Sequence, residues 1–311
     1  MHLRIGTRGS KLALWQADFV AEKLLKAKVT SEIVIIETKG DVILDKSLSK
    51  IGSKGVFTEE LEQQLRTNDI DIAVHSAKDL SSEIVEDLAI IAFMEREMAN
   101  DVLISLNPAI ILDKNSKITI GTSSTRRLAT LRHFYPQVRT VEMRGNLQTR
   151  MDKLKNNVGD AQCDAMILAF AGVNRMKYND FIVQNLDLEQ FTPAVGQGSV
   201  AIQVAKNLPK ETQNMLIQTL NHTPTSMCIG VERAFLRTLQ GGCSVPVFGY
   251  CKILDNQLHF TGGIISLDGQ KIIKKTQTNS FNNAQKLGID VANVLLAEGA
   301  GEILKEIKMG F

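Results

Sequence analysis

The sequence predicts a mixed α/β protein with two lobes and a smaller α+β domain at its carboxyl end. Strand-like and helix-like segments alternate through residues 3–94 and again through 118–169, which is the pattern of two separate βαβ series. From residue 247 onward the pattern changes to three strand-like segments joined by short turns. With 311 residues, the chain is long enough to form the cores of two or three such domains.

The first series is defined by its hydrophobic periodicity. Its expected elements are strands at 3–7, 31–38, 69–75 and 88–94 and helices at 11–28 and 58–67. Ser10 directly precedes the first helix, where a serine side chain can cap the free backbone N–H groups. Arg8 and the pair Lys78-Asp79 each follow a strand. We therefore expect them at the sheet edge where open α/β proteins bind ligands.

The second series repeats this arrangement and ends at a glycine-containing crossing. Its expected elements are strands at 118–121, 138–143 and 164–169, a helix at 125–134 and a further helix entered through Arg144-Gly145-Asn146. Pro136 ends the first of these helices because proline cannot continue it. The segment from Pro193 to Gly198 combines one rigid residue with two flexible ones, which is the composition expected of a crossing between lobes.

The C-terminal part predicts a small α+β domain. A helix expected at 212–220 precedes this domain, whose own expected elements are helices at 227–239 and 282–297 and strands at 247–254, 258–266 and 271–278. The turn sequences Asp255-Asn256 and Asp268-Gly269 join the strands closely, so we expect an antiparallel sheet. The last helix is expected to cover that sheet.

The segment from Gly121 to Arg150 holds the densest group of cations in the chain. Six of the thirteen arginines lie in it, with no lysine and a single acid, Glu142. A planar guanidinium group binds a carboxylate or phosphate with two parallel hydrogen bonds. The segment therefore predicts a binding site for a polyanion. The simpler alternative is a basic helix face that contacts only water.

The composition argues against several classes of protein. A net charge of only +2 and an aromatic content of 5% disfavour a general nucleic-acid-binding surface. No apolar stretch approaches the length of an export signal or membrane span, so we expect a cytoplasmic protein without a membrane partner. The four cysteines form no CxxC pair and have no partnering histidines, so neither a zinc site nor a disulfide framework is expected.

Three positions are candidates for chemistry, and each has a structural alternative. Ser124 ends a hydroxyl-rich turn before a helix, where an anion can bind, but it could simply cap that helix. Asp79 could orient a cationic or N–H-bearing substrate, or it could pair with Lys78 in a loop. Cys243 follows two glycines and precedes a Val-Pro pair, so an exposed, modifiable thiol and a buried small hydrophobe are equal alternatives.

Eight motifs occur in one characteristic order along the chain. They are IGTRGSKLALWQA at 5–17, GDVILD at 40–45, KGVFTEELE at 54–62, HSAKDL at 75–80, GTSSTRR at 121–127, RGNLQTR at 144–150, PAVGQG at 193–198 and GGCSVP at 241–246. In residues and order they resemble the hydroxymethylbilane synthases, also called porphobilinogen deaminases. The motifs span most of the chain, so the resemblance is specific.

The resemblance implies a transferase of tetrapyrrole (haem) biosynthesis. Such an enzyme joins four porphobilinogen molecules stepwise with loss of ammonia, then releases the linear tetrapyrrole hydroxymethylbilane by hydrolysis. The resemblance also implies a dipyrromethane cofactor that the enzyme builds from its own substrate and that Cys243 carries through a thioether bond. The expected partners are porphobilinogen and its pyrrole oligomers, without nucleic acid, and the expected state is a monomer.

The resemblance assigns roles to individual residues, with Asp79 as the catalytic carboxylate and no metal. The expected cofactor-binding residues are Lys78, Ser124, Arg126, Arg127, Arg144 and Arg150. The expected substrate-binding residues are Arg8, Ser10, Gln16, Arg144, Arg150, Arg175 and Gln197. Every pyrrole ring brings an acetate and a propionate, so fixed guanidinium groups would offset the negative charge of the growing chain.

The resemblance further implies three domains, with two lobes like those of periplasmic binding proteins around the active cleft. The first lobe would comprise residues 1–97 and 194–220, the second 98–193 and the C-terminal domain 221–311, which would present Cys243. Because the chain would cross between the lobes twice, hinge adjustment as the product grows is a natural hypothesis. The rival interpretation is a non-catalytic solute-binding protein, since an arginine-lined cleft would also bind a carboxylate ligand.

Overall fold

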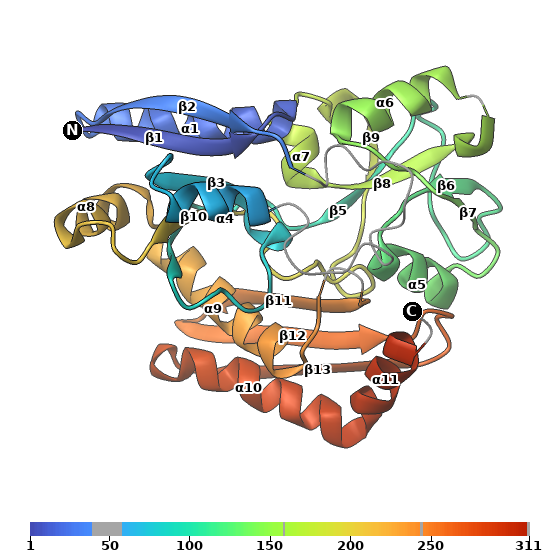
Figure 1. Ribbon diagram of the computed structural model, residues 1–311. Coiled ribbons are helices and arrows are strands. Elements are labelled where there is room, and N and C mark those ends of the chain that lie inside the picture. The colour runs from blue at the N-terminus through green and yellow to red at the C-terminus, as the bar shows by residue number, and fades with distance from the viewer. Residues whose placement is uncertain (39–57, 158, 243–244, 310–311) are drawn as a thin grey trace.

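The computed structural model describes residues 1–38, 58–157, 159–242 and 245–309, and these form three sheets with helices around them (Figure 1). The two five-stranded sheets lie side by side, and the three-stranded sheet lies beneath them in this view. The predicted α/β class, with two lobes and a small C-terminal α+β domain, is confirmed. A membrane span requires about 20 predominantly apolar residues, and none of the described helices meets that requirement.

The first sheet contains strands from two distant parts of the chain. In the order β2-β1-β3-β10-β4, its strands are Thr30–Ile36, His2–Arg8, Ile72–Ser76, Val200–Ala205 and Leu88–Phe93. Strand β1 is parallel to β2 and β3, whereas β10 is antiparallel to β3 and β4. The chain after residue 193 therefore returns to the first sheet, as the discontinuous lobe requires. The domain boundaries at 97, 193 and 220 stay a prediction.

Helices cover both faces of this sheet because its strand residues alternate between two apolar clusters. Helices α1 (Lys11–Lys26) and α8 (Lys210–Leu220) pack with Ile72 and Val74, while α4 (Glu59–Arg66) packs with Ala73. Ser10 caps α1 as predicted, since its hydroxyl accepts a hydrogen bond from the Ala13 amide. The sheet is thus buried on both sides, and its strand ends are left to carry polar residues.

The second sheet has the same number of strands and a related arrangement. In the order β7-β6-β8-β5-β9, its strands are Arg139–Val141, Thr119–Gly121, Ala165–Ala169, Asp101–Ile104 and Ile182–Asn185. The periodicity predicts β6, β7 and β8 but not β5 or β9. Helix α5 (Thr125–Phe134) covers one face, and α6 (Leu147–Asn156) with α7 (Phe170–Arg175) covers the other.

The third sheet is the predicted antiparallel sheet. Its strands are β11 (Val247–Leu254), β12 (Gln257–Ile265) and β13 (Ile272–Asn279). Helices α9 (Thr223–Thr238) and α10 (Ala284–Leu295) share its apolar cluster, and α11 (Gly301–Met309) ends the described chain. The helix expected at 227–239 begins earlier, at Thr223, because Pro224 fits the first turn of a helix.

Two segments, 94–100 and 186–199, connect the five-stranded sheets, and they pack against each other. The Glu97 amide donates a hydrogen bond to the Gly198 carbonyl at 3.2 Å. Gly198 has φ of 98°, and a Cβ atom there would lie 2.5 Å from the Glu97 carbonyl oxygen. Only glycine fits this position, so the two crossings meet backbone to backbone.

Candidate active site

A cleft of about 960 Å³ lies between the two lobes, and residues from both lobes line it. Eight cationic side chains face only three carboxylates in its described lining. The cations are Arg8, Lys11, Lys78, Arg127, Arg132, Arg144, Arg150 and Arg175, and the acids are Glu37, Asp79 and Glu142. The anion site predicted from the arginine-rich segment thus coincides with this cleft between the lobes. Such an excess of positive charge suits a ligand with several carboxylates.

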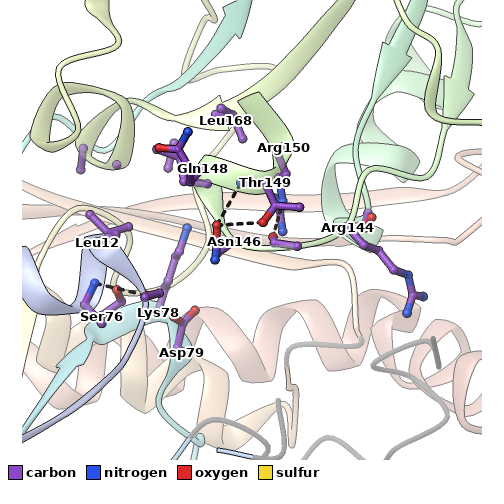
Figure 2. A pocket seen from close by; sticks show the side chains of 18 of the residues that line it. Leu12, Ser76, Lys78, Asp79, Arg144, Asn146, Gln148, Thr149, Arg150 and Leu168 are labelled. Carbon is purple, nitrogen blue, oxygen red and sulfur yellow. Dashed lines mark hydrogen bonds between the residues drawn. The ribbon is translucent and has the colours of Figure 1, made fainter. Parts of the chain in front are cut away.

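Asp79 and Lys78 enter the cleft together from the first lobe (Figure 2). They belong to a single 3₁₀ turn, Ala77–Asp79, that follows β3, which places them at the predicted sheet edge. Burial lowers the pKa of Lys78 to about 8, although the Asp79 carboxylate opposes that shift. No salt bridge joins the two side chains in the described structure. Both groups are therefore available to a ligand.

Arg126 and Arg127 follow each other on α5 but have different surroundings. Each donates one hydrogen bond at 2.7 Å to the buried carboxylate of Asp101, which begins β5. The second hydrogen bond of Arg126 goes to the Thr192 carbonyl, and that of Arg127 to the Ile167 carbonyl. Only Arg127 lines the cleft. The predicted ligand contact of Arg126 stays a prediction.

Asp101 is a site residue that the sequence reasoning misses. It is completely buried, and the two guanidinium groups beside it keep the pKa of its carboxyl well below the usual range, against the effect of burial. It also accepts a hydrogen bond from the side-chain Nε2 of Gln197 at 3.0 Å. The only indication in the sequence is an acid directly before the apolar run Val102-Leu103-Ile104. Asp101 therefore fixes the orientation of Arg127 from behind the cleft.

Arginines of the second lobe and of α7 complete the cationic wall. The Arg150 Nε donates to the Gly145 carbonyl at 2.8 Å, and burial, with a smaller effect of Arg127, lowers its pKa to about 10. Arg144 pairs with the exposed Glu142 at 2.6 Å, and Figure 2 shows its side chain extending away from Arg150. Arg175 donates to the Gly198 carbonyl at 2.7 Å. All three arginines line the cleft.

Neutral polar residues around the cleft act mainly as supports. Ser10 caps α1, and Gln16 donates to Ser76 Oγ at 2.9 Å; both line the cleft. Ser124 accepts a hydrogen bond from the Arg127 amide, so it caps α5 and does not line the cleft. Gln197 is buried and donates to the Ala99 carbonyl and Asp101, also outside the cleft lining. The ligand contacts predicted for Ser124 and Gln197 stay predictions.

Ser123 belongs to the hydroxyl-rich turn before α5, where the sequence predicts that an anion can bind. It lines the cleft, and its hydroxyl is buried without a hydrogen-bond partner in the described structure. The Nε atom of Arg127 is likewise buried without a hydrogen-bond partner among the described residues. Buried polar groups are normally hydrogen-bonded, so these two point to a ligand.

Cys243, the predicted attachment residue, lies outside the described residues, as do the motif at 40–45 and most of the motif at 54–62. The other three cysteines, Cys163, Cys228 and Cys251, are buried free thiols. Burial raises the pKa of Cys163 to about 11, which makes its reactive thiolate form scarce. Among the described cysteines, none lines the cleft.

Comparison with known proteins gives a family match over most of the chain. Residues 3–213 match the family model "Porphobilinogen deaminase, dipyromethane cofactor binding domain", and residues 226–297 match "Porphobilinogen deaminase, C-terminal domain". The chain is 53% identical over 308 residues to the porphobilinogen deaminase of Cytophaga hutchinsonii, covering 99% of this chain and 97% of that protein. It is 44% identical over 309 residues to the porphobilinogen deaminase of Desulfosudis oleivorans, covering 99% and 98%.

The chain is also similar, more distantly, to solved structures. The VFT2 domain of Bordetella pertussis BvgS shares 16% identity with a TM-score of 0.44, covering 70% of this chain and 86% of that one. The methionine-binding protein MetQ shares 13% identity with a TM-score of 0.41, covering 70% and 89%. The evidence for the family comes from the family models and the curated relatives, which confirm the resemblance inferred from the motifs. The chain therefore belongs to the porphobilinogen deaminase family, whose members are transferases.

Proposed function

We propose that this chain is a hydroxymethylbilane synthase. It would join four porphobilinogen molecules stepwise with loss of ammonia and then release the linear tetrapyrrole by hydrolysis. The observation that carries this proposal is the cleft itself, in which the Asp79 carboxylate faces an excess of cations from both lobes. The family membership indicates the substrate class, and the cations that line the cleft suit the carboxylates of porphobilinogen.

The cleft fits the dipyrromethane cofactor of the family. Dipyrromethane carries an acetate and a propionate on each ring, and the buried, unpartnered Ser123 hydroxyl and Arg127 Nε can donate to such carboxylates. Lys78 and Arg150 add positive charge from opposite lobes. When bound, the cofactor supplies the free ring position to which incoming pyrroles are joined. We assign its retention to Lys78, Arg127, Arg144 and Arg150, with Arg126 and Ser124 in support.

Substrate binding is assigned to the rim of the same cleft. Arg8, Arg144, Arg150 and Arg175 would bind the acetate and propionate groups of porphobilinogen, with Ser10, Gln16 and Gln197 in support. Arg175 is already held by the Gly198 carbonyl, so little side-chain freedom is lost when it binds a carboxylate. A fixed guanidinium also stabilises negative charge more strongly than a mobile one does.

Asp79 is assigned the stabilisation of developing positive charge. When the carbon–nitrogen bond of porphobilinogen breaks and ammonia leaves, the remaining ring is electron-poor and its positive charge is shared with the pyrrole N–H. A carboxylate that accepts a hydrogen bond from this N–H stabilises the charge as it forms. Asp79 lies on a short turn directly after a buried strand, which holds the carboxylate in place.

Cys243 is assigned the thioether bond that carries the cofactor, and measurement of the intact mass tests this. The purified chain should carry an adduct of two pyrrole units, the Cys243→Ser variant should lack it, and only the wild-type chain should consume porphobilinogen. An unmodified chain that binds carboxylates without consuming porphobilinogen would favour the rival solute-binding interpretation. We also propose a cytoplasmic monomer that binds neither nucleic acid nor membrane, consistent with the net charge of +2.

A further inference from the structure

A second groove adjoins the active cleft between α1 and the end of α7. This α1–α7 groove has a volume of about 330 Å³ and is lined by Lys11, Leu14, Trp15, Asp18, Arg175, Met176 and Lys177. Lys11, Arg175 and Met176 also line the cleft, so the two spaces share a wall. The volume is at the lower end of the range for small-molecule sites. The groove is therefore large enough for a small ligand on its way to the cleft.

The shared wall of the groove is held in place by contacts within the protein. The Arg175 guanidinium carbon lies 5.3 Å from the centre of the Trp15 ring, and its Nη2 donates to the Gly198 carbonyl at 2.7 Å. The Trp15 ring in turn stacks on Phe19, with 5.3 Å between ring centres. Arg175 is thus a cation held in the wall between the groove and the cleft.

The charges around the groove define the chemistry that it would bind. Lys11, Lys177 and Arg175 supply three cations, and Asp18 supplies one carboxylate. The side chains of Lys11, Lys177 and Asp18 are exposed, and none of them forms a salt bridge within the described residues. The indole of Trp15 and the side chains of Leu14 and Met176 form the apolar wall. This combination suits a flat ring that carries two carboxylates and one ammonium group.

We propose that the α1–α7 groove is a waiting site for intact porphobilinogen, an inference that depends on the proposed function. Its acetate and propionate meet Lys11, Lys177 and Arg175, its ring lies against the apolar wall, and its aminomethyl ammonium group meets Asp18. The tetrapyrrole product has lost every such ammonium group, so Asp18 favours substrate over product. Arg175 contacts the ligand in the groove and again in the cleft.

Fluorescence of Trp15, the only tryptophan of the chain, tests the proposal directly. Rapid mixing of the cofactor-carrying enzyme with porphobilinogen should produce a fast, saturable change in fluorescence. Lys177→Gly should weaken this phase and raise KM by about two- to fivefold, as expected for loss of one exposed charge contact. Lys177 has φ of 57°, which suits glycine, so this variant removes the charge without straining the backbone.

Lys28→Gly is the matched control. Lys28 is also an exposed lysine with positive φ, at 62°, but it lies outside both the groove and the cleft lining. This variant should retain the wild-type fluorescence phase and KM. Asp18→Asn should weaken the binding of porphobilinogen but not of the same pyrrole dicarboxylate without its aminomethyl group.

Three results would overturn the proposal. The first is a fast phase and KM that are identical in Lys177→Gly and Lys28→Gly. The second is a fluorescence change that appears only as tetrapyrrole accumulates, which would make the groove a product site. The third is equal weakening of both pyrroles by Asp18→Asn. Failure of the wild-type enzyme to consume porphobilinogen would instead reject the proposed function, so the two failures are distinguishable.

Discussion

Arg96 and Glu232 form a buried ion pair where both crossings between the lobes meet the C-terminal domain. The Arg96 Nη1 and Glu232 Oε1 atoms are 2.5 Å apart, and the Glu232 side chain is completely buried. Glu232, on α9, also accepts hydrogen bonds from the amides of Gly196 and Cys251, each at 2.8 Å. Arg96 donates in addition to the Gln197 carbonyl at 2.7 Å. One carboxylate therefore ties both crossings to the third sheet.

Loss of this carboxylate should destabilise the protein strongly. Glu232→Ala would leave the Arg96 guanidinium and two backbone amides buried without their partner, at a cost of about 3–5 kcal/mol. Denaturant unfolding measures this change. The control is Asp87→Ala, which breaks the solvent-exposed ion pair between Asp87 and Arg66 and should change the free energy of unfolding much less. Equal losses in the two variants would show that Glu232 does not connect the domains as inferred.

How well each part of the fold could be predicted depends on the range of the interactions that form it. The caps of α1 and α5 each join a serine to an amide three residues later, so the local sequence contains the information. Strand β5 is different. Its first residue, Asp101, can be buried only because Arg126 and Arg127, 25 and 26 residues away, neutralise it. Hydrophobic periodicity does not register such a long-range pair, so β5 could not be predicted.

The same distinction applies to the site. Clustering of arginines in the sequence predicts an anion-binding cleft, and the cleft contains most of them. Clustering does not predict which of two neighbouring arginines faces the cleft, because the side chains of successive helix residues point about 100° apart. Arg127 consequently faces the cleft while Arg126 is directed to Thr192 and Asp101. The Ser124 hydroxyl likewise caps α5, and Ser123 is the one that lines the cleft.

Asp101 should stabilise the fold in a pH-dependent way. Its pKa is lowered in the folded state, so its stabilising contribution is complete above the unfolded value of about 3.9 and is lost as the pH falls below it. Asp101→Asn should therefore reduce the free energy of unfolding at pH 7, and its difference from wild type should shrink below about pH 4. Urea unfolding at several pH values measures this, and a difference that does not change with pH would contradict the assignment.

Lys78 should make cofactor uptake sensitive to pH. Burial lowers its pKa to about 8 in the chain without a ligand, so the ammonium charge is lost as the pH rises through 8. Cofactor-free enzyme given porphobilinogen should gain its two-pyrrole mass adduct more slowly at pH 9 than at pH 7. In Lys78→Arg the positive charge persists at both pH 7 and pH 9. The ratio of the rate of adduct formation at pH 7 to that at pH 9 should therefore be smaller than in the wild type. An unchanged ratio would remove Lys78 from cofactor binding.

Arg144 should require its guanidinium shape as well as its charge. Arg144→Lys keeps one positive charge but cannot bind a carboxylate through two parallel hydrogen bonds, so KM for porphobilinogen should rise by about tenfold or more. The matched control is Arg139→Lys, because Arg139 is exposed on β7 and does not line the cleft. Steady-state kinetics of the two variants decide the point, and similar KM values would count against bidentate binding.

Asp79 should contribute to turnover and little to folding. Asp79→Asn keeps the shape of the side chain but removes the negative charge that we propose stabilises the electron-poor ring, so kcat should fall by about 10²–10³-fold. The variant should still carry the two-pyrrole adduct and unfold at the wild-type denaturant concentration, because no hydrogen bond or salt bridge of Asp79 supports the described structure. Asp87→Asn, at the surface of the same lobe, should retain full turnover. If Asp79→Asn turned over as fast as this control, charge stabilisation by Asp79 could not be part of the mechanism.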